Sequence, residues 1–175
     1  MPDKTLSPPP HTLDHGAFMA RFADIYELSP WVASLAWERG LGPEHDTPEG
    51  LAAAMGQVLA DAEPSRQLEV IRAHPDLAGK AALAGGLTDD STREQAGAGL
   101  DQCNPEELAR FERLNAAYKD RFGFPFVMAV KGQDRHAILE AFETRLENDH
   151  DEERRTAIEQ INRIALLRLR DRAEP

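Results

Sequence analysis

Apolar residues recur along most of this chain at the three- and four-residue spacing that is typical of amphipathic helices. In residues 15–28, for example, Phe18, Phe22 and Ile25 follow one another by four and three positions and would share one helix face. The same periodicity returns in six further stretches. We therefore predict helices over residues 15–28, 29–40, 47–62, 64–73, 104–122, 133–148 and 151–172.

Start and stop signals sharpen these helix boundaries. Ser29, Thr47 and Asn104 are predicted N-caps, because each is a hydroxyl or amide residue placed directly before a proline. The helix at 64–73 is expected to end near Ala73, since the residue before Pro75 is disfavoured in the α region.

Two stretches lack the helical pattern. Residues 74–92 are rich in glycine and alanine and are predicted to form a loop with one helical turn, while 123–130 is a short apolar run with strand character. The predicted fold class is all-α: a single-domain bundle of about seven to nine helices with one extended segment near 124–130. Residues 1–13 are proline-rich and are predicted to be a flexible tail before a helical domain at 14–175.

Composition and charge indicate a globular protein and argue against nucleic acid and membranes as partners. The 175 residues carry a formal net charge of −11, which disfavours binding to nucleic acid, and their 41% apolar content is typical of a globular protein. Cys103 is the only cysteine, so no intrachain disulfide can form and the cytoplasm is the expected location. No apolar run is long enough for a membrane helix, so no membrane partner is expected. An anionic ligand would need a local arginine or histidine.

His74 is the first candidate for chemistry, in the sequence His-Pro-Asp that follows the helix at 64–73. It could be an ordinary helix-terminating histidine, favoured by the C-terminal helix dipole. Alternatively, Pro75 restricts the backbone of His74 and so fixes the direction of an imidazole that titrates near neutral pH. Asp76 could orient that imidazole or cap the next element.

A second candidate group lies at residues 91–95. Ser91 and Glu94 have the spacing of a capping box, with Ser91 as N-cap, and this accounts for both residues. A binding site would add Gln95, because a hydroxyl, a carboxylate and an amide close together suit a urea-like ligand. Thr92 and Arg93 lie within the same group and are included in the predicted substrate-binding set.

Arg168 and residues 126–130 are two further candidates. Arg168 follows Ile164 by four positions and lies on the apolar stripe of the last helix, so it is either buried with an anionic partner or extends to solvent at the helix end. The run 126–130 is either a buried linker or a backbone whose N–H and C=O groups bind a ligand with amide edges. No histidine or cysteine pattern indicates a metal site.

Taken in order, several of these stretches resemble the 2-oxo-4-hydroxy-4-carboxy-5-ureidoimidazoline (OHCU) decarboxylase family of urate degradation. The resemblance covers about Asp14 to Arg170 and depends on the order of the motifs. These are Ser-Pro-Trp-Val-Ala at 29–33, His-Pro-Asp-Leu-Ala-Gly at 74–79, Ser91 with Glu94 and Gln95, Leu114-Asn115 with Tyr118, Phe-Gly-Phe-Pro-Phe at 122–126, and Leu167-Arg168-Leu169.

The resemblance implies a homodimeric helical enzyme without metal or organic cofactor. It also implies the last step from urate to allantoin, in which OHCU loses CO2 and gives (S)-allantoin. The implied catalytic residues are His74, Glu94 and Arg168. The implied substrate-binding residues are Pro75, Ser91, Thr92, Arg93, Gln95, Phe126, Val127, Met128, Ala129 and Val130.

Two other functions remain open from the residues alone. The chain could bind a ureido ligand without catalysis, or it could be a lyase or hydrolase that acts on a different ureido acid. A metal-dependent hydrolase is a third and more distant alternative, and resistance to a chelator would count against it.

Overall fold

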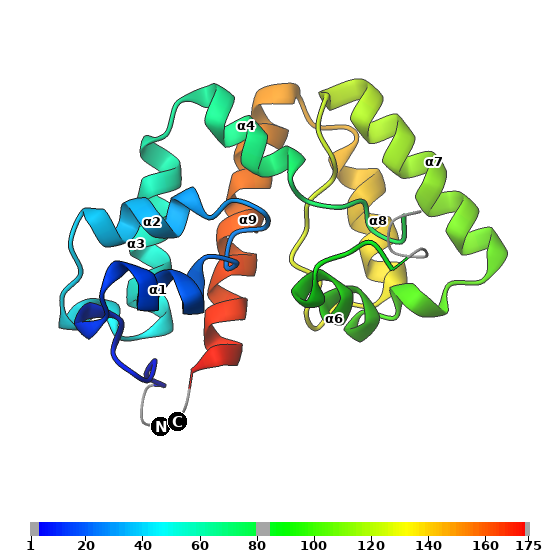
Figure 1. Ribbon diagram of the computed structural model, residues 1–175. Coiled ribbons are helices and arrows are strands. Elements are labelled where there is room, and N and C mark those ends of the chain that lie inside the picture. Colours follow the sequence, from blue (N-terminus) through cyan, green and yellow to red (C-terminus); the bar gives the residue numbers. More distant parts are fainter. Residues whose placement is uncertain (1–3, 80–84, 174–175) are drawn as a thin grey trace. The chain divides into compact units, whose positions relative to one another are not determined.

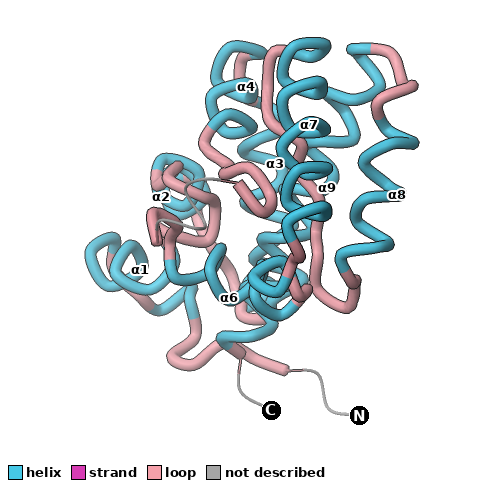
Figure 2. The backbone as a smooth tube through the Cα atoms, turned by 90° about the vertical axis from the view of Figure 1, so that its right-hand side faces the viewer, coloured by secondary structure: helices cyan, strands magenta, loops and turns pink. Residues whose placement is uncertain are grey.

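The computed structural model describes residues 4–79 and 85–173, and these residues contain helices and no strand. Figure 2 shows the same composition of helix and loop. The eight described α-helices are α1 (His15–Phe22), α2 (Trp31–Glu38), α3 (Pro48–Asp61), α4 (Pro64–Arg72), α6 (Asp89–Gly97), α7 (Pro105–Phe122), α8 (Arg135–Arg145) and α9 (His150–Arg172). Three short 3-10 helices are η1 (Pro10–Thr12), η2 (Pro43–His45) and η3 (Leu100–Gln102). The predicted all-α class is confirmed.

The chain divides into two compact units (Figure 1). The first unit comprises Met1–Ala73 with Asn162–Pro175, and the second comprises His74–Ile161. The long helix α9 therefore contributes its first half to the second unit and its last half to the first. No helix in the described part of the chain is long and apolar enough to cross a membrane.

The first unit is built on α1 to α4 and the end of α9. Helix α2 packs against both α1 and α3. The core of this unit consists of apolar side chains that are almost fully buried, among them Phe18, Ile25, Val32, Leu51, Met55, Leu59, Ile71 and Leu169. These residues recur at helical spacing, so burial of one face of each helix explains the fold of this unit.

The described part of the N-terminal segment packs against other residues of the first unit. Leu6 is buried, and its N–H donates to the carbonyl of Asp46 at 2.8 Å. His11 Nδ1 lies 2.7 Å from a carboxylate oxygen of Asp46. These contacts involve residues of the predicted flexible tail, whose mobility in solution stays a prediction.

The second unit has an aromatic core. Tyr118 and Phe111 of α7 and Phe142 of α8 are fully buried together with Phe126 of the loop between these helices. The Phe126 and Phe142 rings are stacked with centroids 3.9 Å apart, and the Tyr118 ring meets Phe126 edge-on at 5.4 Å. Aromatic contacts of this kind attach the extended segment firmly to α7 and α8.

Two of the predicted N-caps are confirmed. Thr47 accepts from the N–H of Gly50 at 3.1 Å, and Asn104 forms a reciprocal capping box with Glu107. Hydrogen bonds from the Asn104 backbone and from Arg135 lower the pKa of the Glu107 carboxyl. The predicted end of α4 near Ala73 is confirmed as well, because Ala73 is its C-cap.

The start of the second helix was predicted wrongly. Helix α2 begins at Trp31 with Pro30 as N-cap, and the hydroxyl of Ser29 donates to the carbonyl of Glu27 at 2.9 Å instead of capping the helix. The preceding helix is also shorter than predicted, because α1 ends at Phe22. A turn follows in which Leu28 has a φ of +48° and is 72% exposed.

The extended segment predicted near 124–130 is confirmed. It connects α7 to α8, contains no helix and is buried except at Met128. Gly123 ends α7 with a φ of +79°, which glycine adopts at little cost. Of the predicted loop 74–92, residues 80–84 lie outside the described residues, and residues 89–92 belong to α6.

Candidate active site

His74 lies at the first position of the loop that follows α4. Helix α4 ends at Arg72, Ala73 is its C-cap, and His74 and Pro75 continue the chain in non-helical conformation. The histidine is only 8% exposed. The side chain is thus held within the fold immediately before a proline, and this favours the interpretation in which the chain fixes the imidazole direction.

The loop after His74 is held by Gln95 of α6. The Gln95 Oε1 accepts from the N–H of Ala78 at 3.0 Å, and its Nε2 donates to the carbonyl of Asp76 at 3.2 Å. Ala78 has a φ of +52°, which is disfavoured by about 1–2 kcal/mol for a residue with a side chain. Both ends of the buried Gln95 amide are therefore used to hold a strained loop.

Helix α7 holds the same loop from a second side. Asn115 Nδ2 donates to the carbonyl of Leu77 at 2.9 Å, and Lys119 Nζ pairs with the Asp76 carboxylate at 2.7 Å. The Asp76 carboxylate therefore pairs with Lys119 of α7, and its predicted role in orienting His74 stays a prediction. Asn115 was part of a motif in the family resemblance but was not predicted as a site residue, although a polar residue on an apolar stripe between Phe111 and Tyr118 was a usable signal.

Replacing Gln95 by alanine is expected to lower the free energy of unfolding by about 1–3 kcal/mol, because the buried N–H of Ala78 would lose its acceptor. Urea unfolding measures the loss, and hydrogen exchange of the Ala78 amide should accelerate. Thr92→Ala, on the exposed part of the same helix, is the control and should change stability by less than about 0.5 kcal/mol. Wild-type exchange at Ala78 in the Gln95 variant would contradict the assignment.

The capping box predicted at Ser91 and Glu94 is wrong. Helix α6 begins at Asp89, and its N-cap is Thr88, whose hydroxyl oxygen accepts from the Ser91 N–H at 3.3 Å. Thr88 provides an acceptor three residues before Ser91, and Asp89 and Asp90 then occupy the first turn, where negative charge is favourable. Ser91 is therefore the third residue of the helix and not its cap.

The predicted residues on α6 divide between two environments. Ser91 and Gln95 are buried and lie on one face, four positions apart, while Glu94 is half-buried. Thr92 is exposed and its hydroxyl donates to the carbonyl of Thr88 at 2.9 Å. Arg93 is also exposed and pairs with Asp90 one turn earlier. The structure thus does not bring Thr92 and Arg93 together with the buried residues.

The backbone of the extended segment is partly used within the protein. The carbonyl of Val127 accepts from Arg145 Nη1 at 2.7 Å, and the N–H of Ala129 donates to Gln160 Oε1 at 2.9 Å. The carbonyl of Val130 accepts from the N–H of Gln133 at 3.0 Å. No hydrogen bond joins the N–H or C=O of Met128 to another residue that the structure describes. Met128 therefore has backbone groups that a ligand could bind.

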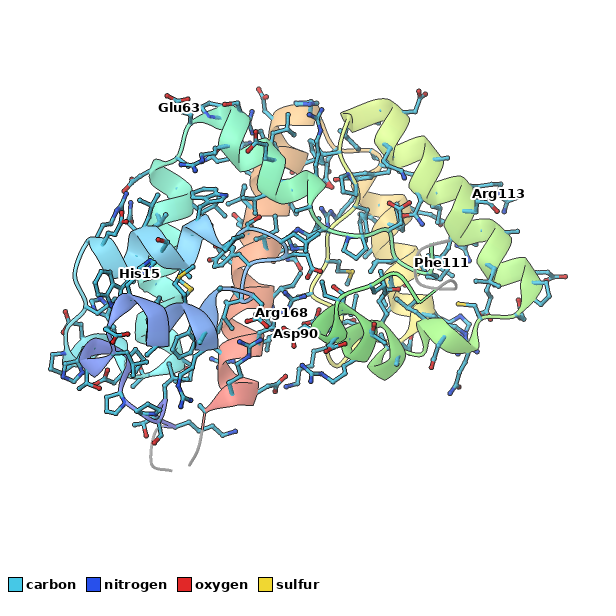
Figure 3. All side chains as sticks on the ribbon, viewed as in Figure 1. His15, Glu63, Asp90, Phe111, Arg113 and Arg168 are labelled. Atoms are coloured by element: carbon cyan, nitrogen blue, oxygen red, sulfur yellow. The ribbon has the colours of Figure 1, made fainter. Side chains whose placement is uncertain are left out.

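Arg168 lies in the first unit, near the end of α9 (Figure 3). Its side chain is 3% exposed, and its Nη2 pairs with Glu27 Oε2 at 2.8 Å, while Nη1 donates to the carbonyl of Ile25 at 3.3 Å. Of the two predicted alternatives, the buried arginine with an anionic partner is confirmed. Glu27 was missed, because it lies 141 positions before Arg168 in the sequence.

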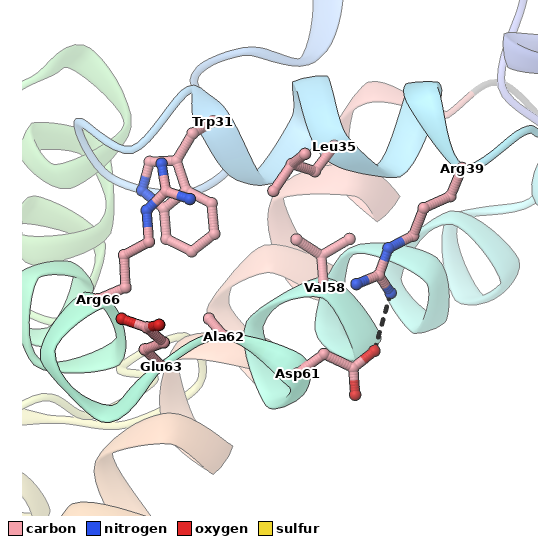
Figure 4. A pocket seen from close by; sticks show the side chains of 8 residues that line it. All are labelled: Trp31, Leu35, Arg39, Val58, Asp61, Ala62, Glu63 and Arg66. Atoms are coloured by element: carbon pink, nitrogen blue, oxygen red, sulfur yellow. Dashed lines mark hydrogen bonds and ion pairs between the residues drawn. The ribbon is translucent and has the colours of Figure 1, made fainter.

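A pocket of about 490 Å³ lies in the first unit (Figure 4). Its wall includes the Trp31 ring, with the Arg66 guanidinium 4.1 Å above the ring centroid, and the ion pair of Arg39 with Asp61 at 2.9 Å. Hydrogen bonds from Gln57 and Arg39 lower the pKa of Asp61, so this carboxylate is ionised at neutral pH. No histidine lines this pocket, and none of its residues was predicted as a site. The proton chemistry predicted for His74 thus stays a prediction for a different part of the chain.

Metal-binding residues do not cluster in the described ranges 4–79 and 85–173. No group of three or more histidine, cysteine, aspartate or glutamate side chains there could hold a metal ion. Independence from metal stays a prediction that a chelator can test.

A family model described as OHCU decarboxylase matches residues 11–170. The chain belongs to the OHCU decarboxylase family. It is 43% identical over 160 residues to the 2-oxo-4-hydroxy-4-carboxy-5-ureidoimidazoline decarboxylase of Haloferax volcanii, covering 91% of each chain. It is 40% identical over 162 residues to the protein of the same name from Halalkalicoccus jeotgali, covering 93% of this chain and 88% of the relative.

A solved structure agrees with the membership of this chain in the OHCU decarboxylase family. The crystal structure of (S)-allantoin synthase superposes with a TM-score of 0.73 at 28% identity, covering 94% of this chain. The match spans 52% of that longer chain. The predicted family is thereby confirmed, whereas the roles of individual residues are not tested by these comparisons.

Proposed function

We propose that this chain catalyses the decarboxylation of OHCU to (S)-allantoin, the last step from urate to allantoin. Membership of the OHCU decarboxylase family supports the reaction and a small-molecule substrate. The observation that carries the assignment of the site is the buried His74, placed before Pro75 in a loop that α6 and α7 both hold. A side chain fixed in this way suits a reaction that must protonate one face of a carbon atom.

The chemistry of OHCU sets what the protein must supply. The substrate bears a carboxylate and a hydroxyl on one ring carbon. When the bond from that carbon to the carboxylate breaks, CO2 leaves and the bonding electron pair passes to the ring. A proton must then bind the same carbon to give allantoin. His74 interacts with the carboxylate and hydroxyl and takes part in the proton transfer, and such a group contributes about 10²–10⁴ in rate.

The other predicted residues orient the substrate or hold the loop. Glu94 accepts from N–H groups of the ring or the ureido chain, and Ser91 and the backbone of residues 126–130 hold the remaining polar edges. Gln95 acts on the loop, because its amide already bonds to Ala78 and Asp76. Arg168 binds a carbonyl or anionic edge and draws off developing charge.

The proposal also covers the location, the oligomeric state and the cofactor requirement of the protein. The enzyme works in the cytoplasm as a homodimer, without a metal or an organic cofactor. Light scattering in solution measures the oligomeric state, and a monomeric active enzyme would overturn that part of the proposal.

The test follows freshly generated OHCU by circular dichroism, with and without the protein and in the presence of a chelator. We expect rapid formation of one allantoin enantiomer that chelation does not slow. Racemic product at the spontaneous rate would overturn the proposal. Binding of OHCU without any rate would then indicate a ureido-binding protein, and turnover of a different ureido acid would indicate a related lyase or hydrolase.

A further inference from the structure

Four segments of the second unit meet at a buried ion pair between Arg145 and Glu153. Arg145 ends α8, and Glu153 lies in the first turn of α9. The Glu153 side chain is fully buried and the Arg145 side chain is 11% exposed, and Arg145 Nε lies 2.6 Å from Glu153 Oε1. A buried ion pair rarely makes a protein more stable than apolar residues of similar volume would. Stability alone therefore does not explain why this pair is buried here.

The Glu153 carboxylate accepts three hydrogen bonds. Besides Arg145, Tyr118 OH donates to it at 2.8 Å and Asn148 Nδ2 at 3.1 Å. Burial is the main reason that the pKa of Tyr118 is raised, and its hydroxyl therefore remains a donor across the physiological pH range. The Glu153 side chain, fixed by these three hydrogen bonds, therefore holds Arg145 in one orientation.

Held in this way, Arg145 contacts the extended segment at two points. Its Nη1 donates to the carbonyl of Val127 at 2.7 Å, and its guanidinium carbon lies 4.3 Å from the centroid of the Phe126 ring. Its Nη2 is buried and has no hydrogen-bond partner in the described part of the chain. A buried donor without a partner costs free energy of folding. The protein retains this cost at Arg145, which indicates that the position of the segment matters more than stability at this point.

The contacts on the two sides of Met128 define what the segment exposes. Arg145 holds the carbonyl of Val127, and Gln160 holds the N–H of Ala129 at 2.9 Å. In extended backbone, successive residues direct their N–H and C=O groups to opposite sides. Val127 is fixed to α8 and Ala129 is fixed to α9. The N–H and C=O of Met128 therefore point away from these two helices.

We propose that Arg145, held by Glu153, is a positioning residue that fixes the backbone of Val127 and thereby presents the N–H and C=O of Met128 to the ureido or ring amide of the substrate. This inference rests on the proposed function. Arg145 acts through the segment and does not itself touch the substrate.

The test replaces both charges at once with Arg145→Met and Glu153→Gln, because removing one would leave the other buried charge without its counter-charge. We expect the KM for OHCU to rise about tenfold, which corresponds to the loss of roughly one hydrogen bond, with kcat changed much less. Hydrogen exchange at the amides of residues 127–130 should accelerate. The matched control is Arg110→Met with Glu143→Gln, an exposed pair between α7 and α8 that should leave KM and exchange unchanged.

A second variant covers a failure of the first to fold. Gln160→Ala removes the contact with the Ala129 N–H without touching the ion pair, and it should also raise KM and exchange. Unchanged exchange at 127–130, or faster exchange with wild-type KM, would overturn the positioning role. A wild-type protein that does not decarboxylate OHCU would instead overturn the proposed function, so the two failures are distinguishable.

Discussion

His74→Ala is expected to lower kcat for OHCU by about 10²–10⁴-fold while the protein remains folded. The variant loses the imidazole that takes part in proton transfer but keeps Pro75 and the hydrogen bonds from Gln95 and Asn115 to the loop. Circular dichroism of OHCU turnover measures the rate. Far-UV circular dichroism and urea unfolding of the variant check the fold.

The matched control for this prediction is His136→Ala. His136 is exposed in the first turn of α8, so its replacement removes a histidine without altering the loop at residues 74–79. The control should keep wild-type kcat. If His74→Ala turned over OHCU at the wild-type rate, His74 would be a helix-terminating histidine and the catalytic assignment would be wrong.

Arg168→Met is expected to lower the free energy of unfolding by about 3–5 kcal/mol, because Glu27 would remain buried without its cationic partner. Burial of both side chains is nearly complete, so little solvent screening reduces this effect. Urea unfolding at pH 7 measures the loss. The exposed pair of Arg170 with Glu49 on the same helix provides the control, and Arg170→Met should cost less than about 1 kcal/mol.

The double variant Arg168→Met with Glu27→Gln separates a structural role from a catalytic one. Removing both charges should recover most of the lost stability. If Arg168 binds the substrate, kcat/KM stays far below the wild-type value in this stable protein. Recovery of activity together with stability would show that the arginine serves only the fold of the first unit.

Several helix caps and helix ends could be predicted from the sequence, because they depend on residues that are close together in the chain. The caps at Thr47 and Asn104 were correct, and so was the end of α4, which Pro75 determines. The same signal of a hydroxyl residue before a proline failed at Ser29, because helix α2 begins one residue later with Pro30 as its N-cap.

The capping-box prediction at Ser91 and Glu94 failed, because Thr88 caps the helix three residues earlier. When two possible N-cap residues lie three positions apart, the helix can begin at the earlier one. The capping-box spacing around the later residue is then a coincidence.

Partners that are distant in the sequence could not be predicted. Glu27 meets Arg168 across 141 positions, and Gln95 meets Ala78 across 17. The sequence indicated that Arg168 needed an anion and that Gln95 had an amide to offer, yet many residues could have supplied each partner. The sequence did not indicate that the Gln95 amide holds the loop that contains His74, and its predicted contact with substrate stays a prediction.

The sequence by itself determined the all-α class, the extended segment near 124–130 and the resemblance to the OHCU decarboxylase family. These features follow from the period of apolar residues, from proline and glycine positions and from the order of short motifs, which are all local properties. Only the tertiary structure decided that Arg145 and Glu153 hold Val127, that Glu27 neutralises Arg168 and that Thr92 and Arg93 are exposed. Burial and hydrogen bonding between distant residues depend on how helices pack, and packing is a property of the whole chain.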